Sequence, residues 1–202
     1  MGIRFDNQVA IVTGAGGGLG KEHALDLARR GAKVVVNDLG GGVDGSGASD
    51  AAKAVVDQIM SEGGEAIANG ASVTDLDAVK AMVNEAMEKW GRIDILVNNA
   101  GILRDKSFHK DSIESFNTVM DVHFQGTLNC THTVYPIMRE QEFGRIIFTS
   151  SSSGVFGNFG QANYGSAKMA MIGLMNTLKL EGQKYNVYTN SITPVAYTRM
   201  TE

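Results

Sequence analysis

The sequence predicts a single α/β domain in which a doubly wound parallel sheet lies between two layers of helices. Short apolar runs alternate along the chain with longer amphipathic segments, the pattern of strands joined by helical crossovers. The runs are apolar at nearly every position, as in strands that are buried on both faces. Glycines cluster where these runs end, and the chain has 25 of them against 2 prolines. Right-handed crossovers between such strands give the three-layer, doubly wound arrangement.

In the N-terminal half we expect four strands with three helices between them. The first strand, 9–12, runs into the glycine-rich stretch 13–20, and the helix after it ends at Gly31, a common helix terminator. The glycine- and serine-rich segment 40–49 is expected to be a loop. The remaining elements are strands at 34–36, 65–68 and 93–97 and helices at 51–60 and 75–90.

The C-terminal half is predicted to add two strands and two long helices. A helix over 112–139 is interrupted near Gly126, and a strand over 145–148 follows Gly144. The second long helix covers 162–184, and the sixth strand covers 187–192. No internal repeat or linker indicates a second domain, so residues 1–202 are expected to form one unit.

The composition of the 202 residues excludes several classes of protein. With 43% hydrophobic residues, the chain can bury enough apolar surface to offset the entropy of ordering, which excludes disorder. The net charge of −4 argues against a nucleic-acid binder, and no uncharged apolar run approaches the roughly 20 residues of a membrane span. A single cysteine, Cys130, excludes an intrachain disulfide and a zinc cluster and suits a reducing compartment. We therefore expect a compact intracellular protein without a metal.

The stretch from Thr13 to Gly20 has the features of a phosphate-binding turn. It joins a strand to the start of a helix, where backbone N–H groups and the helix dipole attract anions. The common G-x-G-x-x-G pattern does not fit, because its last glycine would fall on Leu19. The spacing present is G-x-x-x-G-x-G, through Gly14, Gly18 and Gly20. We expect Thr13, Gly14, Gly18, Leu19 and Gly20 to contact a dinucleotide; the alternative is a flexible turn.

Asp38 follows the second expected strand, eighteen residues after Gly20. A carboxylate at this point of a Rossmann fold accepts hydrogen bonds from the adenosine ribose hydroxyls and repels a 2′-phosphate. No Arg or Lys follows at Leu39 or Gly40, so NAD is favoured over NADP as the cofactor. Lys21, the basic residue close by, is expected to be a solvated lysine at the start of the helix.

Four motifs, in order along nearly the whole chain, resemble those of the short-chain dehydrogenase/reductase family. They are Thr13-Gly14-x-x-x-Gly18-x-Gly20, Asn98-Asn99-Ala100-Gly101, Ser151 thirteen residues before Tyr164, and Tyr164-x-x-x-Lys168. Each motif is weak alone, but chance does not explain all four in register. The resemblance implies an oxidoreductase that transfers hydride to or from NAD.

Within this family the chain looks most like the (3R)-hydroxyacyl-CoA dehydrogenase domains of type 2 multifunctional β-oxidation enzymes. The similar stretches are 36–41, 101–105 and 157–164. The resemblance implies interconversion of a (3R)-3-hydroxyacyl-CoA and a 3-oxoacyl-CoA, a homodimer or homotetramer, and a location in the bacterial cytoplasm or the eukaryotic peroxisomal matrix. One alternative is a family member that acts on another secondary alcohol or ketone, such as a 3-oxoacyl carrier thioester or a steroid. The other is an NAD-binding module that has lost catalysis.

Tyr164, Lys168 and Ser151 can perform the chemistry of alcohol oxidation. Tyr164 and Lys168 are four residues apart on an expected helix and therefore project from one face. A tyrosine titrates near pH 10, but an ammonium and the positive nicotinamide of NAD⁺ would both depress that pKa and make Tyr164 a general base. The resemblance implies that Lys168 also binds the nicotinamide ribose and that Ser151 hydrogen-bonds the substrate oxygen. The alternative for each residue alone is a structural role.

Two positions depart from the usual pattern of the family. His123 stands where many members have Asn in the long helix, at a kink whose backbone carbonyl holds a relay water. His123 is therefore either part of this catalytic relay or a packed helix histidine. Ser72, beside Val73, stands where the family has an adenine-binding Asp, and its hydroxyl can still offer a hydrogen bond.

The resemblance assigns further cofactor contacts at the ends of the fourth and sixth strands. After the fourth strand they are Asn99, Ala100 and Gly101. After the sixth strand, in a segment similar to the one that closes over the nicotinamide, they are Pro194, Ala196, Tyr197 and Thr198. Since the family continues with a lid helix and a seventh strand, we expect the domain 1–202 to be C-terminally incomplete.

Overall fold

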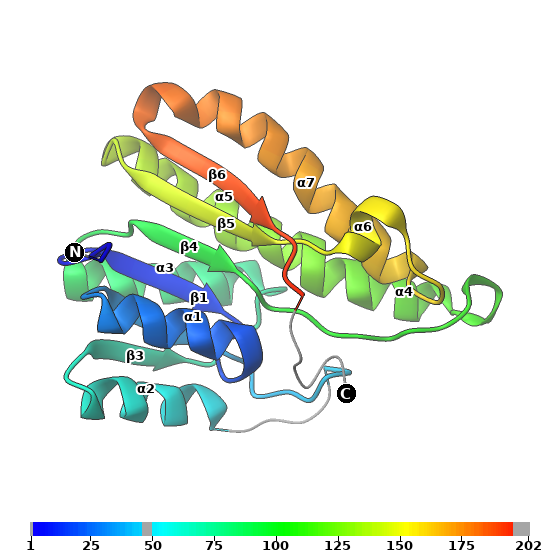
Figure 1. Cartoon of the computed structure of the whole chain (residues 1–202), viewed down its shortest axis with the longest axis horizontal. Helices are drawn as coiled ribbons and strands as arrows, with labels where there is room; N and C mark the ends of the chain where they lie inside the picture. The colour runs from blue at the N-terminus through cyan, green and yellow to red at the C-terminus, as the bar shows by residue number, and fades with distance from the viewer. Residues whose placement is uncertain (1, 46–49, 196–202) are drawn as a thin grey trace.

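The computed structural model describes residues 2–45 and 50–195 and confirms the doubly wound parallel sheet (Figure 1). Within these residues, six parallel strands lie in the order β3-β2-β1-β4-β5-β6. The strands are β1 (Val9–Thr13), β2 (Lys33–Asn37), β3 (Glu65–Asn69), β4 (Ile95–Asn98), β5 (Gly144–Thr149) and β6 (Val187–Ile192). The helices are α1 (Gly18–Arg29), α2 (Ala51–Ser61), α3 (Leu76–Trp90), α4 (Ile113–Met120), α5 (Gly126–Glu140), α6 (Ser152–Phe156) and α7 (Ala162–Gly182).

The helices cover both faces of the sheet. One buried cluster joins β1 and β2 to α1 and α2 and includes Val12 and Leu25. The other joins the opposite face to α3, α5 and α7 and includes Met82, Phe148 and Met171. Because the central strands are covered on both sides, they are apolar at nearly every position, as predicted.

The order of the strands reverses between β1 and β4, which are parallel neighbours paired through Ile11 and Leu96. The chain leaves the carboxyl ends of these two strands toward opposite faces of the sheet. A crevice therefore opens at this edge, where doubly wound proteins bind their ligands.

The predicted helix over 112–139 is interrupted directly before Gly126, close to the position expected. It consists of α4, a π-helical turn at Asp121–Gln125, and α5. A Cβ atom at Gly126 would lie 2.5 Å from a methyl carbon of Val73, so glycine is needed for the close approach of α5. The interruption includes His123, which is buried at the bulge.

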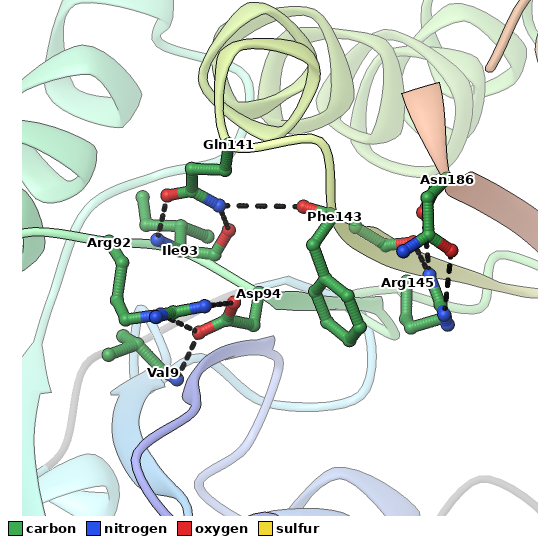
Figure 2. Close-up of polar contacts among 9 residues, drawn as sticks. Val9, Arg92, Ile93, Asp94, Gln141, Phe143, Arg145 and Asn186 are labelled. Carbon is green, nitrogen blue, oxygen red and sulfur yellow. Dashed lines mark hydrogen bonds and ion pairs between the residues drawn. The ribbon is translucent and has the colours of Figure 1, made fainter. Parts of the chain in front are cut away.

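A network of polar contacts stabilises the amino end of the sheet (Figure 2). Asp94 is fully buried; its carboxylate accepts the N–H of Val9 at 2.9 Å and pairs with Arg92 at 2.6 Å. The side-chain amide of Gln141 accepts from the N–H of Ile93 at 2.9 Å and donates to the carbonyl of Ile93 at 2.7 Å. These bonds hold the chain just before β4, which begins at Ile95 and not at Ile93 as predicted.

Candidate active site

A cleft of about 480 Å³ opens at the carboxyl ends of the strands. Both halves of the sheet contribute to its walls. The lining residues that the sequence singles out are Gly14, Gly18, Leu19, Asp38, Ser72, Val73, Asn99, Ala100, Gly101, His123, Ser151, Tyr164, Lys168 and Pro194. Ala196, Tyr197 and Thr198 lie outside the described residues. The structure thus brings together residues that are up to 180 positions apart in the chain (194 − 14).

The turn between β1 and α1 requires glycine at three positions, two for their backbone angles and one for a close approach. Gly14 and Gly18 have φ of +62° and +51°, a region that glycine adopts without strain. A Cβ at Gly20 would collide with the carbonyl oxygen of Gly14. The N-cap of α1, Gly17, has no side-chain partner for the N–H groups of the first helical turn, which face a ligand site.

Thr13 and Gly20, which are predicted to contact the dinucleotide, are not among the residues that line the cleft. The hydroxyl of Thr13 instead accepts the backbone N–H groups of Asn99 and Ala100, at 3.0 and 3.1 Å. The side-chain amide of Asn99 donates to the carbonyls of Thr13 and Gly14, each at 3.0 Å. These contacts fix the turns after β1 and β4 against one another.

The carboxylate of Asp38 faces the glycine turn. It accepts the N–H of Gly16 at 2.8 Å and the N–H of Gly40 at 2.7 Å. A Cβ at Gly16 would lie 2.8 Å from this carboxylate, so the close approach needs glycine. Lys21 is not among the residues that line the cleft. A cradle of backbone N–H groups beside a carboxylate fits a dinucleotide with free ribose hydroxyls.

The wall beyond Asp38 is formed by Ser72 and Val73. The hydroxyl of Ser72 lies 2.8 Å from that of Thr74, and the carbonyl of Val73 accepts from the side-chain amide of Asn129 at 2.9 Å. Sequence reasoning missed Asn129, although a buried polar residue on the inner face of a long helix is a recognisable signal.

The segment 40–49 was expected only to be a loop, yet Gly41, Gly42, Val43 and Gly45 line the cleft. The carbonyl of Val43 accepts the N–H of Leu103 at 2.9 Å, and the carbonyl of Asp44 accepts from the guanidinium of Arg104. The segment therefore bridges the ends of β2 and β4. Its composition gives no sign of this partner.

Ser151, Tyr164 and Lys168 converge on the opposite wall of the cleft. The hydroxyl of Ser151 caps α6 by accepting the N–H of Ser153 at 3.2 Å, whereas the neighbouring Ser150 is buried and donates to the carbonyl of Lys168. Lys168 is also buried. Its Nζ donates to the carbonyl of Thr149 at 2.6 Å and lies 5.3 Å from the centre of the Tyr164 ring.

Burial governs the titration of these groups. It raises the pKa of Tyr164 above its ordinary value; a hydrogen bond with Ser151 lowers this pKa, and the carboxylate of Asp105 raises it further. Burial also lowers the pKa of Lys168 to about 7. The predicted depression of the pKa of Tyr164 relies on the ammonium of Lys168 together with bound NAD⁺; among the protein's own groups, burial has the largest effect on this pKa.

His123 lies in the π-helical turn and contacts Tyr164. The two rings meet edge to face, with their centroids 5.1 Å apart. Its Nε2 lies 2.8 Å from the carbonyl oxygen and 3.1 Å from the nitrogen of Ile102, and Nδ1 has no partner among the described residues. Burial, aided by the charge of Lys168, lowers the pKa of His123 to about 3, so the ring is neutral.

The match to known proteins decides the family. The family model of the short chain dehydrogenases matches residues 8–202. The chain belongs to this family. None of its described helices has both the length and the apolar character needed to cross a bilayer. In the described part of the chain, no group of three or more His, Cys, Asp or Glu side chains is arranged to hold a metal ion.

Two curated relatives indicate where this short-chain dehydrogenase belongs within the family. It is 56% identical over 201 residues to the peroxisomal multifunctional enzyme type 2 of Drosophila melanogaster. The aligned residues make up 99% of this chain and 33% of that protein. It is 43% identical over 196 residues to a 3-oxoacyl-[acyl-carrier-protein] reductase of Synechocystis, covering 96% of this chain and 76% of that one. The chain thus spans about a third of the length of the Drosophila relative.

Two solved structures share the fold of this dehydrogenase. A short chain dehydrogenase from Mycobacterium avium superimposes with a TM-score of 0.89 at 44% identity, covering 98% of this chain and 70% of that one. A 7α-hydroxysteroid dehydrogenase in complex with NADH and a 7-oxo bile acid gives a TM-score of 0.88 at 33% identity, covering 96% of this chain and 73% of that one.

Proposed function

We propose that this short-chain dehydrogenase uses NAD to interconvert a (3R)-3-hydroxyacyl-CoA and the corresponding 3-oxoacyl-CoA. The observation that carries the proposal is the convergence of Ser151, Tyr164 and Lys168 on one wall of a cleft whose other wall holds the glycine turn and Asp38. A hydroxyl donor, a phenol and a buried amine beside a dinucleotide cradle are the groups that alcohol oxidation requires.

The cofactor end of the cleft is built for the adenosine half of NAD. The first N–H groups of α1 would hold the pyrophosphate, together with Gly14, Gly18 and Leu19. Asp38 would accept the ribose hydroxyls, and its charge would repel a 2′-phosphate. Ser72, Val73 and the turn of Asn99, Ala100 and Gly101 would enclose the adenosine, and Pro194, Ala196, Tyr197 and Thr198 the nicotinamide. Bound NAD⁺ would supply the hydride acceptor.

At the reacting end, Ser151 orients the substrate alcohol by a hydrogen bond to its oxygen. Tyr164 takes the hydroxyl proton onto its phenolate oxygen during oxidation and returns it during reduction. Lys168 binds the nicotinamide ribose and connects Tyr164 to solvent. The π-helical turn at His123 serves the proton relay through its backbone, while the imidazole packs against the ring of Tyr164.

The substrate class and the assembly are inferred from the resemblance to the family. The resemblance to multifunctional β-oxidation enzymes implies a hydroxyacyl-CoA substrate. The name of the Drosophila relative supports a peroxisomal location in a eukaryote. A bacterial protein would act in the cytoplasm. A homodimer or homotetramer would pair the helices α4, α5 and α7. The outer face of α7 suits such a contact, since Met169 and Leu180 are 50% and 70% exposed there.

A second candidate is the reduction of a 3-oxoacyl carrier-protein thioester, which the similarity to the Synechocystis reductase favours. Initial rates distinguish the two. We expect oxidation of (3R)-3-hydroxyacyl-CoA with NAD⁺, at least tenfold faster than with NADP⁺ and with no turnover of the (3S) isomer. If the protein instead preferred NADPH and an acyl carrier-protein thioester, the hydroxyacyl-CoA proposal would be rejected in favour of the reductase.

A further inference from the structure

The helix that carries Tyr164 begins without a conventional side-chain cap. The N-cap residue of α7, Gln161, makes no capping hydrogen bond, and the first main-chain bond of the helix runs from the N–H of Gly165 to its carbonyl. The N–H of Tyr164 therefore needs another partner. Asn163 provides it, because its Oδ1 accepts that N–H at 2.6 Å.

The other end of the Asn163 amide binds a distant segment. Its Nδ2 donates to the carbonyl of Arg104 and to the Oδ2 of Asp111, each at 3.0 Å. Asn163 is 1% exposed. A carbonyl and a carboxylate oxygen face its Nδ2 and an N–H faces its Oδ1, so the orientation of the amide is fixed by chemistry. Only an amide can satisfy all three partners.

Two neighbouring contacts hold the same two segments together. The N–H of Lys106 donates to the carbonyl of Gly160 at 2.9 Å, and the side chain of Gln161 donates to Asp105 at 2.8 Å. Asp105 is the carboxylate whose charge raises the pKa of Tyr164. Within this set of contacts, Asn163 is the buried member that touches the backbone of Tyr164.

We propose that Asn163 is a positioning residue: through Asp111 and the carbonyl of Arg104 it sets where α7 begins, and thereby where the hydroxyl of Tyr164 stands relative to Ser151. The proposal rests on the proposed function for its catalytic consequence. A displacement of about 1 Å at a reacting group can cost on the order of a hundredfold in rate. Asn163 is expected to touch neither substrate nor cofactor.

The test compares Asn163→Ala and Asn163→Asp with the wild type. Asn163→Asp is nearly isosteric but places a carboxylate against the carbonyl of Arg104 and the carboxylate of Asp111. For both variants we expect kcat to fall about 10- to 100-fold, the affinity for NAD⁺ to stay within twofold, and the pH profile of kcat/KM to shift. Adding Asp111→Asn to Asn163→Asp lets the amide at position 111 donate to the new carboxylate and should recover at least a third of the lost kcat on a logarithmic scale.

Gln141→Ala is the matched control, because Gln141 is also an amide bound to backbone groups but lies at the amino end of the sheet (Figure 2). It should lower the melting temperature and leave kcat and the pH profile unchanged. Wild-type kcat in both Asn163 variants, or equal loss in Gln141→Ala, would overturn the proposal.

Hydrogen exchange provides a readout that does not depend on activity. In Asn163→Asp the amides of 158–168 and 104–111 should lose protection at least tenfold, while those of β1 and β4 stay protected. Unchanged exchange in those two segments would overturn the proposal even if the rate fell. If the wild type oxidised no secondary alcohol, the proposed function would fail, and the exchange result would still decide the placement of α7.

Discussion

The ring of His123 stands edge-on to the ring of Tyr164, with the two planes at 89°. On its other side, Nε2 of the same imidazole contacts the backbone of Ile102, next to the turn that lines the cleft. A Cβ at Gly101 would collide with the imidazole, so the ring and this turn are in close contact. A neutral ring thus links the turn after β4 to the proposed base, and protonation would place an uncompensated charge in a fully buried site.

We expect the free energy of unfolding to decrease as the pH falls from about 6.5 toward 3, in part because of His123. Its pKa in the folded state is about 3, below the roughly 6.5 of an exposed histidine. Between these values the unfolded chain binds a proton that the folded chain does not, so stability rises with pH by up to about 1.4 kcal/mol per unit. His123→Phe should lose this slope in urea unfolding between pH 4 and 6.5. The exposed His132 on α5 provides the control, and His132→Phe should keep the slope.

Replacement of Lys168 should separate stability from activity. The pKa of about 7 in the folded state lies below the roughly 10.4 of an exposed lysine, so the wild type gains stability as the pH rises from 7 to 10. Lys168→Met lacks this gain, and its stability relative to the wild type should therefore be highest near pH 7 and decline toward pH 10. Its kcat should fall at least 100-fold. Lys179 is exposed on the same helix, and Lys179→Met should match the wild type in both stability and kcat. A stability of Lys168→Met that increases relative to the wild type as the pH rises from 7 to 10 would contradict the low pKa of Lys168.

Tyr164→Phe tests the general base directly. Loss of the phenolic hydroxyl should reduce kcat by about 10²- to 10⁴-fold, the usual contribution of a positioned acid or base. The affinity for NAD⁺, measured by calorimetry, should change less than twofold. Tyr185→Phe removes a hydroxyl that Arg139 binds at the surface, and it should retain full activity. Residual turnover above a tenth of the wild-type rate in Tyr164→Phe would refute the role.

Asp38 should determine the choice of cofactor. Asp38→Asn keeps the size of the side chain but removes the charge that repels a 2′-phosphate, so the ratio of kcat/KM for NAD⁺ over NADP⁺ should fall at least tenfold. The variant should also lose some affinity for NAD⁺, because the carboxylate holds the N–H groups of Gly16 and Gly40. Asp57→Asn on the surface of α2 is the control. An unchanged ratio would remove Asp38 from cofactor selection.

The sheet and the placement of the glycine turn and Asp38 at the cleft could be predicted because their signals are local. The buried strand, the glycines at fixed spacing and Asp38 all belong to a single βαβ unit. Each of these elements can be predicted from its own residues. The interruption near Gly126 was also recognisable, although the close approach of Val73 that requires glycine there comes from another part of the chain.

The remainder depends on contacts across the fold. The bond from Leu103 to Val43 joins residues 60 positions apart, and that from Asn163 to Asp111 joins residues 52 positions apart. Neither partner carries a sequence signal for the other. The burial that raises the pKa of Tyr164 likewise arises only when α7 packs against the sheet, so its effect could not be predicted from the sequence.

The two ends of β4 make different contacts. The segment leading into it carries the Arg92–Asp94 ion pair, and its far end passes into Asn99 and the cleft. Substitutions at the ion-pair end are therefore expected to change the melting temperature with little effect on the cleft. Changes of substrate preference can be sought at the Asn99 end of the strand.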